Sequence, residues 1–309
     1  MNIIVTGALG HIGTYLLSNS HLIRKVNKIY AIDKLDDRML NLINLKLKKK
    51  INFINLDLSK KNLKFDNKFK IDILIHLASR TDAASSFKHE KEVYRNNLSC
   101  FENVVNFCQK RNIKLIHISS TSVYGSQKKF VDETCKDLVP QSPYAKVKII
   151  EEMRLKKTKK SFRFITLRFG TIAGPSSGMR FHTAVNKFCM QAFMKQPLNV
   201  WETALNQYRP YLSIRDAFKT FDFIITNKLF DRSIYNVVSE NLTVKDIIRK
   251  LNIKNTKIKL VKTKIMNQLS YKIDNAKIKK TGLKLNNKIK DDIKNTFKVL
   301  KLKSLYEDI

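Results

Sequence analysis

Tyr144 and Lys148 form the residue pair whose types and spacing best fit acid–base chemistry. They lie four residues apart in SPYAKVKIIEEMRL, where Ser142 fits a helix N-cap and Pro143 the first turn, so a helix would place both side chains on one face. A tyrosine phenol, with a pKa of about 10, is a poor base at neutral pH, but a nearby ammonium favours its phenolate. Such a pair can remove the proton of a substrate hydroxyl as hydride leaves the same carbon.

Ser120 ends the apolar run KLIHISS at 114–120, which has the composition of a buried strand. Ligands of open α/β sheets bind beyond the carboxyl ends of the strands, so this hydroxyl is expected near the same substrate oxygen. The alternative is a buried strand-end hydroxyl without a chemical role. The Y-x-x-x-K spacing recurs at residues 30–34 and 124–128, but the first falls in a predicted strand and the second in a predicted turn.

Three of the eight glycines, Gly7, Gly10 and Gly13, follow the first apolar run at intervals of three. After a strand, glycines allow a sharp turn into a helix and a close approach of backbone N–H groups to a pyrophosphate, which the helix N-terminus also attracts. The sequence therefore predicts a dinucleotide cradle, although a plain strand-to-helix turn can use glycines too. Asp33 ends the second run, where an acid can accept the ribose hydroxyls and repel a 2′-phosphate; this favours NAD, and Lys34 beside it leaves NADP open.

The elements that must position these residues are short apolar runs separated by segments compatible with helices. This alternation predicts a doubly wound parallel sheet of the Rossmann type with crossover helices and a smaller α+β C-terminal lobe. We expect an NAD-binding domain over residues 1–165 and a substrate-binding lobe over 166–309, interleaved because the sixth strand returns to the sheet. The runs are at 3–7, 28–33, 52–57, 72–78, 114–120 and 164–170.

Composition narrows the class of protein. The 309 residues are 43% hydrophobic with no run long enough for a bilayer and no leader, which predicts a cytoplasmic protein without a membrane partner. Four scattered cysteines and no His grouping argue against disulfides and against a metal site. The formal charge of +34 could indicate a nucleic-acid partner, but the lysines are spread along the chain without interleaved aromatic residues, so we expect no specific nucleic acid.

The motifs together resemble the extended short-chain dehydrogenase/reductases, specifically the NAD-dependent nucleotide-sugar epimerase/dehydratase group. The resemblance covers nearly the whole chain and is carried by TGALGHIG (6–13), LDL (56–58), HLAS (76–79), NNLS (96–99), SSTSVYG (119–125), Y-x-x-x-K (144–148), LRFGTIAGP (167–175) and RPYLSIRD (209–216). It implies Ser120, Tyr144 and Lys148 as catalytic residues. It also implies that NAD binds at Gly7, Gly10, His11, Ile12, Gly13, Asp33, Asp57, Leu58, Leu77, Ala78, Asn97, Tyr144 and Lys148.

On the substrate side, the resemblance implies contacts from Ser120, Thr121, Thr171 and Arg209, with Arg209 facing a phosphate. The family often has Asn at the position of Thr171, so recognition of the nucleotide sugar is expected to differ there. The segment MRFHTAVNKF (179–188) resembles the family's lid, with His182 expected on its surface. Family members often dimerise through the helices near Asn97 and Tyr144, so a homodimer is expected.

Which reaction this chain catalyses depends on the residues after Ser120. Dehydratases of the group commonly have Asp-Glu there, whereas this chain has Thr121 and Ser122. The sequence therefore favours an epimerase that oxidises a sugar hydroxyl transiently. A reductase or dehydrogenase of a sugar or other carbonyl compound is the first alternative, and a non-catalytic or RNA-associated protein of the same fold is the second.

Overall fold

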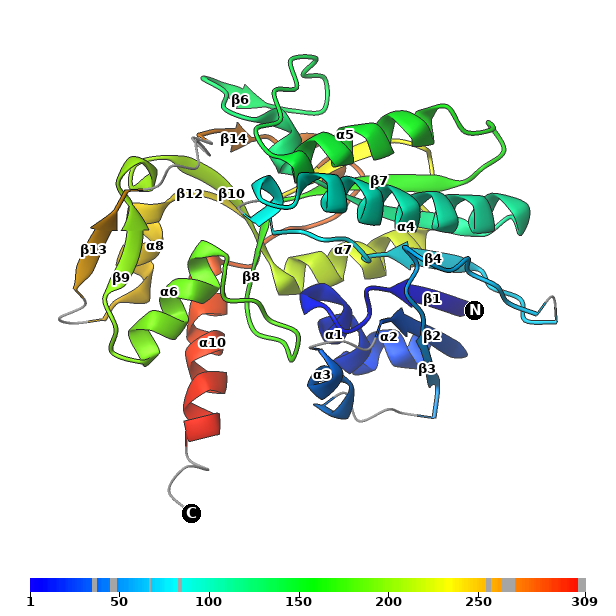
Figure 1. The fold of residues 1–309 in the computed structure, drawn as a ribbon, viewed down its shortest axis with the longest axis horizontal. Coiled ribbons are helices and arrows are strands. Elements are labelled where there is room, and N and C mark those ends of the chain that lie inside the picture. Colours follow the sequence, from blue (N-terminus) through cyan, green and yellow to red (C-terminus); the bar gives the residue numbers. More distant parts are fainter. Residues whose placement is uncertain are drawn as a thin grey trace.

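The six apolar runs form a parallel sheet, and a seventh strand from later in the chain completes it (Figure 1). The computed structural model describes residues 1–34, 38–44, 49–66, 68–82, 85–253, 257–262 and 270–304. The strand order is β11-β7-β5-β4-β1-β2-β3, and all neighbouring strands are parallel. The strands are β1 (Asn2–Thr6), β2 (Lys28–Asp33), β3 (Ile51–Asn55), β4 (Ile73–His76), β5 (Lys114–Ser120), β7 (Phe164–Phe169) and β11 (Ile234–Val237).

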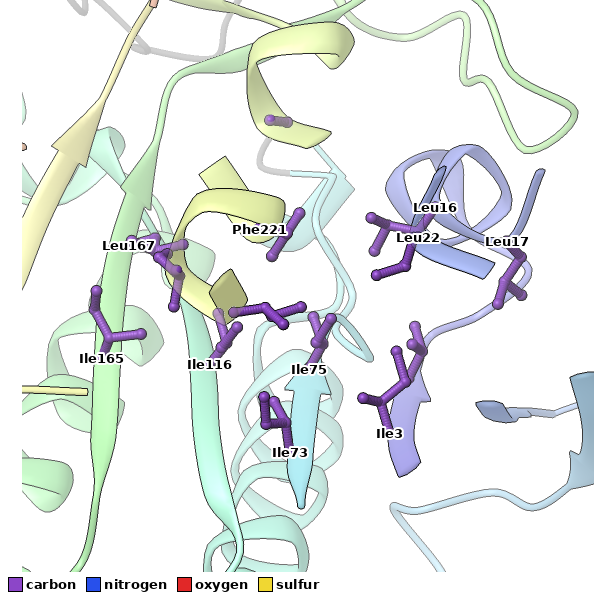
Figure 2. Packing of buried hydrophobic residues seen from close by; sticks show 14 of the residues in the cluster. Ile3, Leu16, Leu17, Leu22, Ile73, Ile75, Ile116, Ile165, Leu167 and Phe221 are labelled. Carbon is purple, nitrogen blue, oxygen red and sulfur yellow. The ribbon is translucent and has the colours of Figure 1, made fainter. Parts of the chain in front are cut away.

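Helices cover both faces of the sheet, because the strands carry apolar side chains on both faces. One face packs against α1 (His11–Ser18), α2 (Ser20–Lys25) and α7 (Ile214–Asn227), and the other against α4 (Glu90–Lys110) and α5 (Pro143–Lys156). Figure 2 shows the first of these layers, in which Ile3 and Ile75 lie opposite Leu22. The predicted doubly wound α/β class is confirmed.

The helix that carries the Tyr144–Lys148 pair begins where the sequence predicts. Ser142 Oγ accepts a hydrogen bond from Ala145 N at 3.2 Å, and Pro143 is the first helical residue. The cap satisfies one backbone donor of the first turn. It thereby fixes the start of α5, so that Tyr144 enters the helix just beyond the carboxyl end of β5.

A second lobe lies to one side of the sheet (Figure 1) and has its own apolar core. Its helices pack against two small sheets, in the orders β12-β10-β8 and β13-β9. A third pair of short strands, β14-β6, lies beside α5 and belongs to a separate apolar cluster. The elements are β6 (Phe130–Val131), β8 (Thr171–Ala173), α6 (Ala184–Phe193), β9 (Leu198–Trp201), β10 (Tyr208–Ser213), β12 (Glu240–Thr243), α8 (Val244–Leu251), β13 (Ile258–Val261), β14 (Lys272–Ile273) and α10 (Ile289–Ser304). Short helices α3 (Met39–Asn44), α9 (Ala276–Lys280), η1 (Ser85–Phe87), η2 (Thr121–Tyr124) and η3 (Glu202–Ala204) complete the described chain.

The two lobes are interleaved in sequence. β7 spans the predicted boundary at residue 165, and both α7 and β11 return to the main sheet after β8 and β10 have entered the lobe. The four cysteines are free thiols, three of them buried. Over the described ranges, no helix is both long and apolar enough to cross a membrane.

Candidate active site

A cavity of about 610 Å³ opens at the carboxyl ends of the central strands and continues along the lobe. Its wall includes nearly every residue that the sequence analysis assigned to cofactor, substrate or chemistry. Those residues are Gly7, Gly10, His11, Ile12, Gly13, Asp33, Asp57, Leu58, Leu77, Ala78, Ser120, Thr121, Tyr144, Lys148, Thr171 and Arg209. A volume of this size exceeds that of a water-filled packing defect and lies in the range of ligand sites.

The glycine-rich turn has no room for a side chain at Gly7 or at Gly13. Gly7 has a φ of +68°, and a Cβ there would lie 2.6 Å from the carbonyl carbon of Leu77. A Cβ on Gly13 would lie 2.5 Å from the carbonyl oxygen of Gly7. The turn therefore packs closely against the end of β4 and against the start of α1. Its backbone lines the cavity at the N-terminus of α1, where a pyrophosphate would bind.

Two carboxylates line the cofactor end of the cavity. Asp33 at the end of β2 accepts hydrogen bonds from Leu9 N and Lys34 N, at 2.8 and 2.9 Å, which holds its side chain against the glycine-rich turn. For Asp57, burial acts to raise the pKa, but hydrogen bonds from Ser59 and nearby lysines outweigh it and the pKa lies below its usual value. A carboxylate at the position of Asp33, at the end of the second strand, fits the ribose hydroxyls of NAD.

Of the predicted cofactor residues, all of which lie in the described part of the chain, Asn97 alone does not line the cavity. Its neighbour Asn96 does. The amide of Asn97 lies behind the wall, accepting from Arg80 N at 2.8 Å and donating to Arg80 O at 3.1 Å. Because Arg80 itself lines the cavity, Asn97 fixes the backbone of the wall. Its direct contact with NAD stays a prediction.

The three predicted catalytic residues meet at one place in the cavity. Lys148 Nζ lies 5.8 Å from the ring centre of Tyr144, one helical turn away on α5. Ser120 Oγ is hydrogen-bonded to Ser122 Oγ at 2.8 Å and accepts from Ser122 N at 3.1 Å. The Ser120 hydroxyl and the Lys148 ammonium therefore flank the phenol, as proton transfer to or from a bound alcohol requires.

The electrostatics of Tyr144 differ from the simple expectation. Burial raises the pKa of the phenol above its usual value, although Lys148 and the hydrogen bond with Ser120 act to lower it. Glu151 acts in the same direction as burial: its Oε2 accepts from Lys148 Nζ at 2.7 Å, and this carboxylate also disfavours the phenolate. Without a bound ligand, Tyr144 is therefore a protonated phenol at neutral pH.

On the substrate side, Thr121 Oγ1 lies 3.3 Å from both Phe169 O and Tyr271 Oη, and Thr171 and Arg209 lie farther along the wall. His182 is exposed and lines the cavity too. Sequence reasoning missed Arg180, two residues earlier. Its guanidinium is half-buried in the wall and donates to Thr81 Oγ1 at 2.5 Å.

Arg180 ends a segment, Gly174–Arg180, that lies across the glycine-rich turn. We call it the docking segment. His11 Nε2 lies 2.7 Å from Gly174 O, Ser176 Oγ donates to His11 O at 2.9 Å, and Gly178 N donates to Thr14 Oγ1 at 3.0 Å. The lobe is thus bonded directly to the part of the fold that would hold the cofactor.

The comparisons with known proteins agree with this geometry. Residues 3–237 match the model of the NAD dependent epimerase/dehydratase family. A trifunctional UDP-glucose 4,6-dehydratase/UDP-4-keto-6-deoxy-D-glucose 3,5-epimerase/UDP-4-keto-L-rhamnose-reductase of Arabidopsis thaliana is 27% identical over 91% of this chain. The match covers 44% of that protein, so this chain spans less than half the length of such relatives. The uncharacterized UDP-glucose epimerase YtcB of Bacillus subtilis is 29% identical over 71% of each chain.

Among solved structures, UDP-glucuronic acid 4-epimerase from Bacillus cereus, in complex with UDP-glucuronic acid and NAD, superposes with a TM-score of 0.85. It is 25% identical, and the match covers 98% of this chain and 99% of that one. The similarity thus includes the C-terminal lobe as well as the sheet, and the cofactor bound in that structure agrees with the cradle described above. Because the matched family segment takes up well over half of its residues, this chain belongs to the NAD dependent epimerase/dehydratase family, and its cofactor is NAD.

Proposed function

We propose that this protein is a nucleotide-sugar epimerase that oxidises one sugar hydroxyl to a ketone and then returns the hydride to the opposite face. The observation that carries the proposal is the meeting of Ser120, Tyr144 and Lys148 in the cavity that also contains the glycine-rich turn. The two positions after Ser120 hold hydroxyls, Thr121 and Ser122, where elimination of water would call for carboxylates. This composition fits reversible oxidation at a single carbon.

The residues that would hold NAD follow the wall of the cavity. These residues all line the cavity. The turn from Gly7 to Gly13, with His11 and Ile12, would hold the pyrophosphate, Asp33 the adenosine ribose, Asp57 and Leu58 the adenine, and Leu77 and Ala78 the middle of the cofactor. When bound, NAD supplies the hydride acceptor and, after rotation of the keto sugar, the hydride donor. The remaining chemistry belongs to this chain's own side chains.

With oxidised NAD bound, the positive charge of its nicotinamide would add to that of Lys148 and favour the phenolate of Tyr144. This phenolate would accept the proton of the sugar hydroxyl at Oη and return it when the alcohol re-forms. Lys148 stabilises the phenolate, and the Ser120 hydroxyl hydrogen-bonds to the same sugar oxygen. Because the proton that leaves the sugar also returns to it, the cycle requires no net exchange with solvent. The burial of Tyr144 and Lys148 supports such a closed cycle.

The substrate end of the cavity supports a nucleoside-diphosphate sugar. Arg209 and Arg180 supply guanidinium groups suited to phosphate oxygens, and Thr171 offers a hydroxyl. Buried hydroxyls of Ser79, Thr183 and Tyr211, all residues of the wall, have no hydrogen-bond partner among the described residues. A ligand with several hydroxyls would form hydrogen bonds with these groups and so offset part of the free-energy cost of burying them unpaired. The named 4-epimerase of Bacillus cereus makes carbon 4 the first position to test.

A dehydratase is the second candidate, because Asp82 adds a carboxylate to the wall and the Arabidopsis relative is named for dehydration. Purified protein is incubated with UDP-, GDP- and dTDP-sugars, once with catalytic NAD and once with NAD in excess of the sugar, and products are followed by proton NMR and by NADH absorbance. An epimer without net NADH change is expected, and Tyr144→Phe should abolish it. A 4-keto-6-deoxy product would favour the dehydratase, and stoichiometric formation of NADH would favour a dehydrogenase. No product from any of these sugars would refute the proposed function.

A further inference from the structure

The cation beside Tyr144 belongs to a buried ion pair. Lys148 Nζ donates to Glu151 Oε2 at 2.7 Å, and the side chains of the two residues are 3% and 1% exposed. Tyr144 and Lys148 are therefore accompanied by a carboxylate that the Y-x-x-x-K pattern does not contain. A buried anion at this place acts on the phenol with the opposite sign to the lysine.

A histidine from the sheet holds the carboxylate in place. His117 Nε2 lies 2.9 Å from the same oxygen of Glu151, and its Nδ1 lies 3.4 Å from Thr166 Oγ1 on β7. The ring is fully buried, with Phe101 packed edge-on at 5.5 Å between ring centres. Because an ionised carboxylate only accepts, His117 donates from Nε2 and accepts from Thr166 at Nδ1.

We propose that Glu151, anchored by His117, is a positioning residue that keeps Lys148 charged and sets how strongly that charge acts on Tyr144. The inference rests on the proposed function, in which Tyr144 is the proton acceptor. Its physical basis is the shared contact: the ammonium, the carboxylate oxygen and the imidazole N–H form one continuous hydrogen-bonded chain from α5 to β5. The carboxylate leaves the ammonium in place but cancels part of its field at the phenol.

The direction of each pKa agrees with this reading. Burial acts to lower the pKa of Lys148, but Glu151 outweighs it and the pKa lies above its usual value. Burial acts to raise the pKa of Glu151, yet Lys148 and His117 hold it at about 2. The titratable and charged groups that act on this set from α5, β4, β5, α4 and the docking segment are Tyr144, Glu152, His76, His117, Cys100 and Arg180.

Glu151→Gln keeps the shape of the side chain and removes its charge. The phenolate then loses a repelling neighbour, so the midpoint for ionisation of Tyr144 should fall. A charge in close contact shifts a pKa by about 1–3 units. Glu151 contacts Lys148, which lies between it and Tyr144, so we expect the pKa of Tyr144 to fall by about one unit. Lys148 also loses the counter-ion that favours its charged form, but the Tyr144 phenolate favours the same ammonium, so Lys148 stays charged as the phenol ionises and the predicted fall is retained.

The test needs no sugar substrate. Tyrosinate absorbance of the NAD-loaded protein is titrated against pH, and the curve of the matching Tyr144→Phe variant is subtracted to isolate this one phenol. The matched control is Glu152→Gln. Glu152 is the next residue, equally buried, and its carboxylate contacts Arg168 at 2.9 and 2.6 Å and Ser119 at 2.6 Å instead.

A lower midpoint in Glu151→Gln and an unchanged midpoint in Glu152→Gln would support the proposal. An unchanged midpoint in Glu151→Gln, or an equal shift in both variants, would overturn it. Should Glu151→Gln not fold, Lys148→Met is compared with the double variant Lys148→Met/Glu151→Gln, which leaves no buried charge of this pair uncompensated. The Tyr144 midpoint of the double variant should be lower than that of Lys148→Met. An equal midpoint in the two variants would also overturn the proposal. Because the readout is ionisation, failure to find an epimerase substrate does not affect it.

Discussion

Replacing Gly178 with alanine should separate the docking segment from the glycine-rich turn. A Cβ at Gly178 would lie 2.5 Å from the carbonyl oxygen of Gly10, 2.6 Å from its carbonyl carbon and 2.7 Å from the carbonyl oxygen of Leu9. All three are backbone atoms, so no side-chain rotation can relieve the contact. The segment must therefore move away from the turn.

The size of the effect follows from the hydrogen bonds that the segment makes. The bond from Gly178 N to Thr14 Oγ1, at 3.0 Å, is the nearest to the clash, and Ser176 makes two more, with His11 O at 2.9 Å and with Thr14 Oγ1 at 3.1 Å. A hydrogen bond contributes about 1 kcal/mol net. The free energy of unfolding should fall by about 1 kcal/mol if one bond is lost and by about 3 kcal/mol if all three are lost.

The assay is urea denaturation followed through the single tryptophan, Trp201, with NAD affinity measured by calorimetry on the same samples. If the docking segment helps to hold the turn in its binding conformation, each loss of about 1.4 kcal/mol of that support lowers the affinity for NAD tenfold. Ser177→Ala is the control, because Ser177 is the exposed neighbour within the same segment. Equal stability and equal NAD affinity in Gly178→Ala and Ser177→Ala would show that the segment does not dock on the turn.

Three further predictions follow from other parts of the structure. Gly13→Ala places a Cβ 2.5 Å from the carbonyl oxygen of Gly7, so the glycine-rich turn must open; calorimetry should show NAD binding weakened well beyond any loss in a Ser177→Ala control, and unchanged binding would contradict the cradle. Ser120→Ala should lower kcat of the epimerase by about 10²-fold with a smaller change in KM, because one hydrogen bond to the reacting oxygen is lost; an effect confined to KM would exclude that role. Burial raises the pKa of Asp292 on α10 from 3.8 to about 6, so the native state binds more protons than the unfolded state in that window and wild-type stability falls as pH rises through it. Asp292→Asn does not titrate, so its stability relative to wild type should rise by about 2 kcal/mol between pH 4 and pH 6 in urea denaturation, and a flat difference would refute the assignment.

Local motifs explain why so much of the site could be predicted from the sequence. The glycine-rich turn, the strand end at Ser120 and the capped helix that carries Tyr144 each depend on residues within about ten positions of one another. Their spacing fixes their geometry before any tertiary contact is known. The position of strand β11 in the sheet was harder to predict from the sequence. This strand contributes only four residues to the edge of the sheet and follows the lobe elements in the chain.

The adjacent glutamates in IIEEM show what sequence spacing could not resolve. Glu151 and Glu152 are identical in type and equally buried, but successive residues on a helix point in directions about 100° apart. Glu151 therefore meets Lys148 and His117, whereas Glu152 meets Arg168 and Ser119. Only the packing of α5 against β5 and β7 decides which cation each carboxylate receives.

The buried ion pairs also show why the charge of +34 is a poor guide to function. Acidic residues are scarce, 26 against 60 basic ones, yet two of them are adjacent in the interior as counter-ions to Lys148 and Arg168. Removing one partner of such a pair costs about 3–5 kcal/mol, so these positions are constrained while exposed sites tolerate lysine freely. Arg180 differs from both cations: over the described part of the chain, no carboxylate lies within ion-pair distance of its guanidinium, although it is half-buried in the cavity wall. Asp82 and Asp33 attract this guanidinium from a longer distance, and the phosphates that the proposed cofactor and substrate carry would add a counter-charge in direct contact.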